Sequence, residues 1–107
     1  MEHRIQFLRD AKGQPVGCVA IRVRQVTVKR TLIEYQYSVL NPLDRFDRRL
    51  ARQLALGRMV EAPYTATVGA SPSRHDISEA VMENIATDQG APTRARKAAK
   101  LWLSWNC

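Results

Sequence analysis

Apolar and polar residues alternate along most of the first 40 positions, with the period of two that is typical of a β-strand with one face against a core. The alternating stretches are residues 18–24 and 31–40. A short apolar stretch at residues 5–8 precedes them, and turn-forming residues at 10–15 separate it from the first. The alternation shifts phase after Val23, which predicts a bulge, a bend or a strand end there. These positions predict an antiparallel meander of three strands.

The period changes to that of a helix between residues 41 and 60. Asn41-Pro42 favours a helix start, with Asn41 or Asp44 as the N-terminal cap. At about 100° per residue, one arc of about 80° collects the apolar positions of this helix. The positions in the arc are Leu43, Phe46, Leu50, Leu54 and Gly57. We expect this arc to cover the sheet, although Gly57 is equally compatible with the end of the helix.

The second half of the chain predicts a short edge strand at 64–68 and two more helices. One helix begins at Ser71-Pro72 or at Asp76, and the last runs from about Thr93 to Trp105. The length of 107 residues, with 45% hydrophobic and 25% charged, suits one small core. The pattern therefore predicts a single α+β domain over residues 1–107. In it, a three- or four-stranded antiparallel sheet is covered on one face by about three helices.

No apolar run approaches the roughly 20 residues that would cross a bilayer, and the N-terminus lacks the layout of a signal peptide. We therefore expect a cytoplasmic protein with no membrane partner. The two cysteines, Cys18 and Cys107, form no CxxC motif and have no paired histidines. We expect free thiols and no metal site.

The formal net charge of +7 at pH 7 makes polyanions natural partners of this chain. The balance is uneven, because residues 1–30 hold seven Lys or Arg against two carboxylates, whereas residues 61–90 hold one Arg against five. An acidic segment between basic ones can balance part of the surplus within the protein.

Two basic groups are candidates for binding a polyanion. The first lies on the 41–60 helix, within an arc of about 100° away from the apolar positions, and consists of Arg45, Arg48, Arg49 and Arg52. It spans roughly 10 Å, enough for more than one phosphate or several carboxylates. The alternative is that Asp44, Asp47 and the acidic segment balance this face. The second group lies on the last helix and consists of Arg94, Arg96, Lys97 and Lys100.

The tryptophans of the last helix share its alanine-rich arc, so we expect Trp102 and Trp105 to be buried rather than to stack on nucleic-acid bases. Arg22 and Arg24 form a third, smaller basic group on the outer side of the sheet. Ordinary solvation explains these two arginines equally well.

The sequence contains no glycine-rich phosphate loop, nucleophile elbow, HExxH motif or carboxylate cluster with metal-binding spacing. We therefore expect no catalytic residue and no cofactor. Glu34 and Glu61, near a basic face, leave a small metal-dependent nuclease as the alternative.

The segments 15–21 and 38–58, which include Asn41-Pro42 and the arginine run, resemble small accessory proteins encoded by tailed bacteriophages. The resemblance covers about residues 1–60 and assigns no site residue. It implies an intracellular product, in the host cytoplasm, that binds nucleic acid, host factors or defence complexes, for example as an inhibitor of host defence. The basic charge argues against an acidic mimic of DNA.

These observations predict a non-catalytic protein that uses its arginine-rich helical face to bind a polyanion. The polyanion is nucleic acid or the acidic surface of a host nucleic-acid-processing or defence complex. The alternatives are the nuclease and a structural subunit that forms oligomers, and a homodimer is left open.

Overall fold

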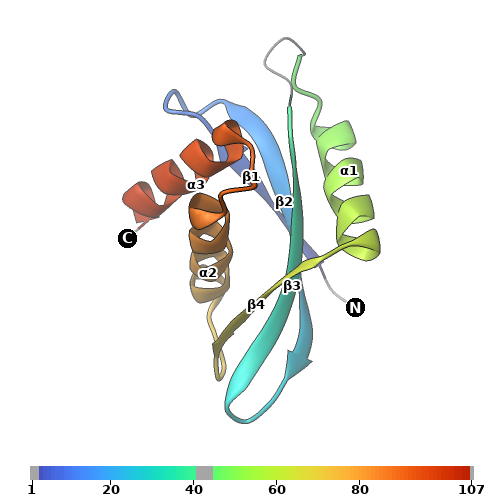
Figure 1. Cartoon of the computed structure of the whole chain (residues 1–107), viewed down its shortest axis with the longest axis vertical. Coiled ribbons are helices and arrows are strands. Elements are labelled where there is room, and N and C mark those ends of the chain that lie inside the picture. The colour runs from blue at the N-terminus through green and yellow to red at the C-terminus, as the bar shows by residue number, and fades with distance from the viewer. Residues whose placement is uncertain (1–2, 41–44, 107) are drawn as a thin grey trace.

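Four strands and three helices make up the computed structural model, which describes residues 3–40 and 45–106 (Figure 1). The strands are β1 (His3–Arg9), β2 (Pro15–Val26), β3 (Arg30–Val39) and β4 (Tyr64–Gly69). The helices are α1 (Arg48–Glu61), α2 (Arg74–Thr87) and α3 (Thr93–Asn106). All neighbouring strands pair antiparallel in the order β1-β2-β3-β4, so the predicted α+β class with its meander is confirmed.

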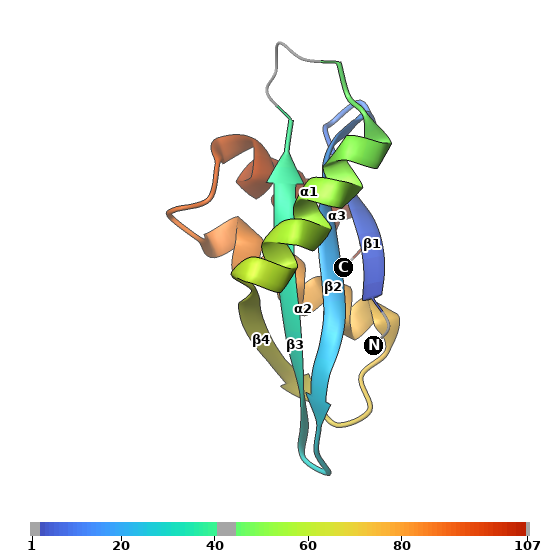
Figure 2. The same ribbon diagram turned by 90° about the vertical axis from the view of Figure 1, so that its right-hand side faces the viewer.

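The helices divide between the two faces of the sheet, which corrects the expectation that they share one face. α1 lies on one side, and α2 and α3 lie on the other (Figure 1, Figure 2). Residues 16–21 of β2 are all buried. Because successive strand residues face opposite sides of a sheet, both faces must be covered there. Val19 and Ile21 join the core under α2 and α3, whereas Cys18 and Ala20 join the core under α1. In the sequence, the alternating pattern does not show whether small side chains such as those of Cys18 and Ala20 face a second core or solvent.

α1 packs on the sheet through Ala51, Ala55 and Met59, which are buried and four residues apart. The predicted arc is wrong for Leu50 and Leu54, which are 48% and 44% exposed, whereas Phe46 packs against this core as expected. The buried face is displaced from the two leucines by one residue, which is about 100° around the helix.

The helix also begins later than predicted. α1 begins at Arg48, where the Asp47 side chain accepts a hydrogen bond from the Leu50 N–H at 3.1 Å. The predicted caps, Asn41 and Asp44, and the predicted core residue Leu43 lie outside the described residues. Gly57 neither packs nor ends the helix, since it is exposed inside α1.

The larger core lies under α2 and α3. Ile33, Tyr35 and Tyr37 of β3 pack there with residues of α2 that include Val81 and Ile85. α3 contributes its buried alanines, which are Ala95, Ala98 and Ala99.

The start of α2 also differs in detail from the prediction. Ser73 caps the helix, and Asp76 is its third residue rather than the cap. The Ser73 hydroxyl accepts from the Asp76 N–H, and the Asp76 carboxylate accepts from the Ser73 N–H, both at 3.0 Å. These two hydrogen bonds form a capping box. The Ser73 N–H, and then the Ser73 hydroxyl, hold the pKa of the Asp76 carboxyl below its usual range.

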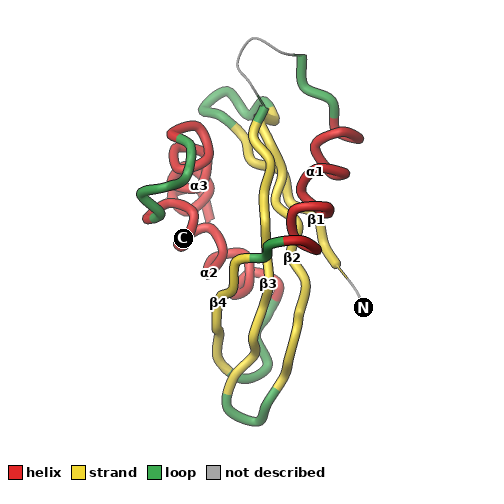
Figure 3. The backbone as a smooth tube through the Cα atoms, turned by 45° about the vertical axis from the view of Figure 1, so that its right-hand side comes forward, coloured by secondary structure: helices red, strands yellow, loops and turns green. Residues whose placement is uncertain are grey.

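The β2–β3 hairpin reaches beyond the end of β1 (Figure 3). β1 pairs with β2 only as far as Arg22, whereas β4 pairs with β3 from its first residue, Arg30, so that only the turn at 27–29 extends past β4. The pairing register shifts between Val23 and Gln25, which confirms the predicted irregularity after Val23.

Candidate functional site

Three arginines of the first predicted group lie together on the first turns of α1. Arg48, Arg49 and Arg52 are exposed and line a shallow concavity of about 380 Å³ with Gln53 and Leu56. We call these three residues the arginine cluster. The fourth member, Arg45, is exposed but precedes the helix, because α1 begins only at Arg48.

The arginine cluster has no carboxylate within 4.0 Å among residues 3–40 and 45–106. The Arg48 guanidinium lies 5.2 Å from the centre of the Phe7 ring, a cation–π contact that orients it without neutralising it. Phe7 in turn meets Phe46 edge-on, with 6.1 Å between ring centres. Arg49 and Arg52 form no hydrogen bond with other described residues. Their charge is therefore open to solvent or to a partner.

The acidic segment does not balance this cluster, although the sequence allowed that interpretation. The Asp76 carboxylate accepts from the Ser73 N–H at the start of α2, and Glu79 lies 3.2 Å from the Nε2 atom of His75. Both carboxylates belong to α2, on the other side of the sheet from α1 (Figure 1).

The second predicted group is separated from the first, because α3 and α1 cover opposite faces of the sheet (Figure 1, Figure 2). Arg94 is half-buried, and its Nη1 donates to the Leu40 carbonyl at 2.6 Å, beyond the end of β3. Arg96 is also half-buried and donates to the Thr93 hydroxyl at 3.3 Å. Only Lys97 and Lys100 are fully exposed. The two predicted groups therefore do not share a surface.

The α3 tryptophans differ from each other in exposure. Trp102 is half-buried and stacks on His75, with 5.7 Å between ring centres. Trp105 is 53% exposed, so the expected burial holds in part for Trp102 and is wrong for Trp105.

The third group, Arg22 and Arg24, shares a face with the arginine cluster. Side chains alternate along β2, so Arg22 points to the same side as Cys18 and Ala20 under α1. The Arg22 Nε donates to Glu34 Oε1 at 2.8 Å, and the Arg24 Nε lies 4.0 Å from the same oxygen. One carboxylate therefore meets two guanidiniums, and a net positive charge remains.

Arg30 is the first residue of β3 and lines a second concavity, of about 340 Å³, with Gln25, Thr27, Leu32 and Thr67. Leu32 and Glu34 alternate with the buried residues of β3, so this concavity opens on the α1 side of the sheet. Arg22, Arg24 and Arg30 therefore lie on the α1 side of the sheet, beyond the C-terminal end of α1, whereas the arginine cluster lies at the N-terminal end of that helix.

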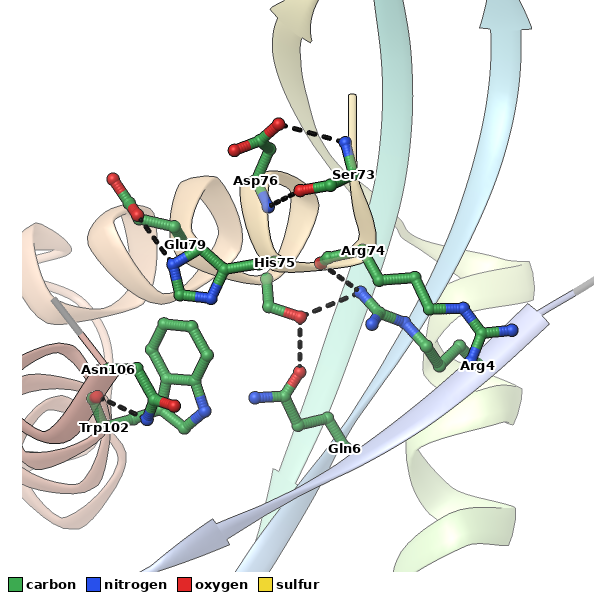
Figure 4. A network of polar contacts seen from close by, with 10 residues as sticks. Arg4, Gln6, Ser73, Arg74, His75, Asp76, Glu79, Trp102 and Asn106 are labelled. Atoms are coloured by element: carbon green, nitrogen blue, oxygen red, sulfur yellow. Dashed lines mark hydrogen bonds and ion pairs between the residues drawn. The ribbon is translucent and has the colours of Figure 1, made fainter. Parts of the chain in front are cut away.

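A polar network on the opposite face joins β1 to α2 (Figure 4). Arg4 Nη2 donates to the Ser78 hydroxyl at 2.8 Å and to the Arg74 carbonyl at 3.2 Å. The Ser78 hydroxyl donates to Gln6 Oε1 at 2.7 Å. Burial, and then the charge of Arg74, lower the pKa of Arg4. These groups satisfy one another, so the network fixes α2 on β1.

The two carboxylates of the nuclease alternative lie in different settings. Glu34 is held by Arg22, and Glu61 is the last residue of α1. Burial raises the pKa of the Cys18 thiol, which packs under α1. Across residues 3–40 and 45–106, no three side chains of His, Cys, Asp and Glu gather as metal ligands would.

No helix in the described ranges is both long and apolar enough to cross a membrane. Comparison with protein-family models, with curated proteins and with solved structures finds no match to this chain.

Proposed function

We propose that this protein is a non-catalytic binding protein that holds a polyanion against the arginine cluster of α1. The observation that carries the proposal is that Arg48, Arg49 and Arg52 lie side by side, exposed, with no carboxylate partner among the described residues. Like charges at such spacing repel one another, and a bound anion relieves that repulsion. Folding does not need these charges, because α1 is held by Ala51, Ala55 and Met59.

Nucleic acid is the polyanion that this face favours. Arg22, Arg24 and Arg30 lie on the same side of the sheet, beyond the other end of α1, along a molecule whose longest dimension is 45 Å. A duplex carries one phosphate charge per about 1.7 Å of its axis, so a single ligand reaches both groups. The acidic surface of a host nucleic-acid-processing or defence complex is the competing partner. In either case the protein acts in the host cytoplasm, as a bacteriophage accessory protein would.

The test is a pair of double variants that remove equal charge from opposite sides of the sheet. Arg49→Ala with Arg52→Ala changes the arginine cluster and leaves Arg48, which packs on Phe7, in place. Lys97→Ala with Lys100→Ala is the matched control on α3, where both lysines are exposed.

Fluorescence anisotropy with labelled nucleic acid, over a range of salt concentrations, gives the affinity and its salt dependence. We expect the α1 variant to weaken binding by about 2- to 30-fold, since an exposed ion pair contributes about 0.2–1 kcal/mol. The slope of log K against log salt should fall by about 2. The α3 control should change much less. Equal effects of the two double variants would contradict a site on α1, because they would show only the influence of net charge.

The competing functions predict different results in the same samples. A protein partner predicts a salt-tolerant complex that is recovered from host lysate and lost at one or two arginine anchors. A nuclease predicts turnover of the labelled nucleic acid that requires a divalent metal and is lost in Glu34→Gln. An oligomer-forming subunit predicts a mass in solution that is a multiple of the 12.1 kDa chain.

A further inference from the structure

A groove of about 420 Å³ follows the outer edge of β1, which is one of the two edge strands of the sheet (Figure 2). Ile5, Gln6 and Phe7 line it from β1, and Trp102 and Trp105 line it from α3. Consecutive residues of a strand face opposite sides of a sheet. A groove that touches three consecutive residues therefore lies along the edge of β1 and not on one face, so its occupant meets the backbone of the strand.

The backbone of β1 is available for pairing along this edge. Among the described strands, β1 pairs with β2 alone. Every second residue of an edge strand turns its N–H and C=O groups away from the neighbouring strand, where an added strand can pair with them. Charged side chains often protect such edges, but residues 5–8, between Arg4 and Arg9, are uncharged. The middle of β1 is therefore an edge without that protection.

Trp105 forms an exposed apolar wall of the groove. It is 53% exposed, although the same helix buries Ala95, Ala98 and Ala99. Its indole N–H donates to no group within residues 3–40 and 45–106. Trp102, one turn earlier, is half-buried and stacked on a histidine ring, which fixes it in place. A large, rigid ring beside a groove is typical of a binding anchor, because it loses little conformational entropy on binding.

The charges around the groove favour an acidic occupant. Arg9 lines the groove, and no carboxylate of the described residues does. On the α1 side of β1, the Arg48 guanidinium lies 5.2 Å from the centre of the Phe7 ring. A second copy of the chain would bring its own cationic β1 and a net charge of +7 to this edge, and like charges repel. A strand that carries carboxylates is therefore favoured over β1 of a second copy.

We propose that the outer edge of β1 binds an extended protein segment of alternating apolar and acidic residues as a fifth strand of the sheet. Main-chain hydrogen bonds to β1 supply affinity, and the side chains of the segment alternate between two faces. The apolar ones pack on Trp102 and Trp105, and the acidic ones lie beside Phe7 and Arg48. This site does not depend on the proposed function, because only Arg48 of the arginine cluster lies near the groove.

The first experiment measures the binding of three labelled heptapeptides to the full chain by fluorescence anisotropy. In the test peptide, valine and glutamate alternate. The second peptide has the same composition, with the valines grouped before the glutamates, and the third has lysine in place of each glutamate. We expect the test peptide to bind about tenfold more tightly than the other two, because it alone presents one apolar and one acidic face as a strand.

Two variants test the two kinds of side-chain contact. Trp105→Ala should weaken binding of the test peptide by roughly 30-fold, the loss typical of an aromatic anchor. Val60→Ala is the matched control, since Val60 is 68% exposed but lies on α1. Arg9→Glu should weaken the test peptide by about 2- to 5-fold and strengthen the lysine peptide. Trp105 and Arg9 are exposed, so the circular dichroism of both variants should match that of the parent.

Hydrogen exchange identifies the edge that binds. Amide exchange within residues 3–9 should slow when the test peptide is bound, because outward N–H groups of β1 gain partners. Exchange within residues 64–69 is the internal control, because β4 is the other edge strand and should exchange as in the free chain.

We would abandon this site if Trp105→Ala bound the test peptide as the parent does, or if the three peptides bound equally. Protection of β4 in place of β1 would also reject it, and so would a failure of the parent to bind any of the peptides. The proposed function is tested separately, since nucleic-acid binding that depends on Arg49 and Arg52 would stand after each of these results.

Discussion

The orientation of α1 on the sheet predicts that two substitutions in that helix lower the free energy of unfolding by clearly different amounts. Met59 of α1 is 2% exposed and packs against the sheet, whereas Leu54 of the same helix is 44% exposed. Replacing a fully buried Met by Ala typically costs about 2–5 kcal/mol, because transfer and cavity terms add. For Leu54 only about half of the side chain leaves water on folding, so Leu54→Ala should cost about 1 kcal/mol.

Urea denaturation of the two variants measures this difference directly. The m-values should equal that of the parent, so that the shift of each midpoint reports stability alone. In a domain of this size, 1 kcal/mol corresponds to about 4 °C or more in Tm. We therefore expect Met59→Ala to lower Tm by at least about 8 °C and Leu54→Ala by about half of that. Leu50→Ala, at a residue that is 48% exposed, should behave like Leu54→Ala.

A Leu54→Ala variant as damaged as Met59→Ala would refute this orientation of α1. It would place the leucine arc against the sheet and turn the helix by about 100°. The arginine cluster would turn with it, and Arg48 would leave the ring of Phe7, from which it now lies 5.2 Å. The stability measurement therefore tests the geometry on which the binding proposal depends.

Two further substitutions test the sheet itself. Gly17→Ala should destabilise the protein by about 1–3 kcal/mol or more, because the added methyl group would overlap the backbone carbonyl oxygen of Ser38. Gly69→Ala, where nothing lies within 4 Å of the added group, is the control in the same denaturation assay. Burial, and then the neighbouring Tyr64, raise the pKa of Tyr37 to about 12 from an ordinary value of 10.0. The folded state therefore holds the phenolic proton more tightly, so stability is full below pH 10 and falls as the pH approaches 12. Tyr37→Phe should reduce this alkaline loss when the unfolding free energy is measured on both sides of pH 10.

The strands could be predicted from the sequence because each has alternation over several residues and a turn signal beside it. β3 is the clearest case, since Ile33, Tyr35 and Tyr37 face the larger core while Gln36 and Ser38 face the other way. Alternation reports the local conformation of a strand, and that conformation does not depend on which helix covers it.

The face of α1 could not be predicted, because its contacts are made by small residues. Leu50 and Leu54 have the stronger apolar signal, yet Ala51 and Ala55 lie against the sheet. Two features of β2 and β3 explain this choice: Cys18 and Ala20 leave room for a close approach, and the Ser38 hydroxyl donates to the Ala51 carbonyl at 2.9 Å. Both features involve residues far from α1 in the sequence, so no local pattern shows them.

The sequence also could not show which arginines make contacts within the protein and which are exposed to a partner. β4 pairs with β3 only as far as Tyr35, so the rest of that edge needs other partners. Arg58 Nη1 donates to the Tyr37 carbonyl at 3.0 Å, and Arg94 Nη1 donates to the Leu40 carbonyl. A buried or edge carbonyl must be satisfied, so these two arginines serve the fold.

The net charge of +7 therefore overstates the number of cations that can bind a partner, because several of them make contacts within the fold. Arg4, Arg58 and Arg94 donate to groups of the protein itself, and their long side chains are fixed by those contacts. On the α1 side, by contrast, the arginine cluster has no carboxylate among the described residues, and Arg22 and Arg24 share a single one. Exposed cations also occur on the other face, where Lys97 and Lys100 lie on α3. If a polyanion binds at the arginine cluster as we propose, removal of two charges from α1 should weaken binding more than removal of two charges from α3, because the two helices cover opposite faces of the sheet.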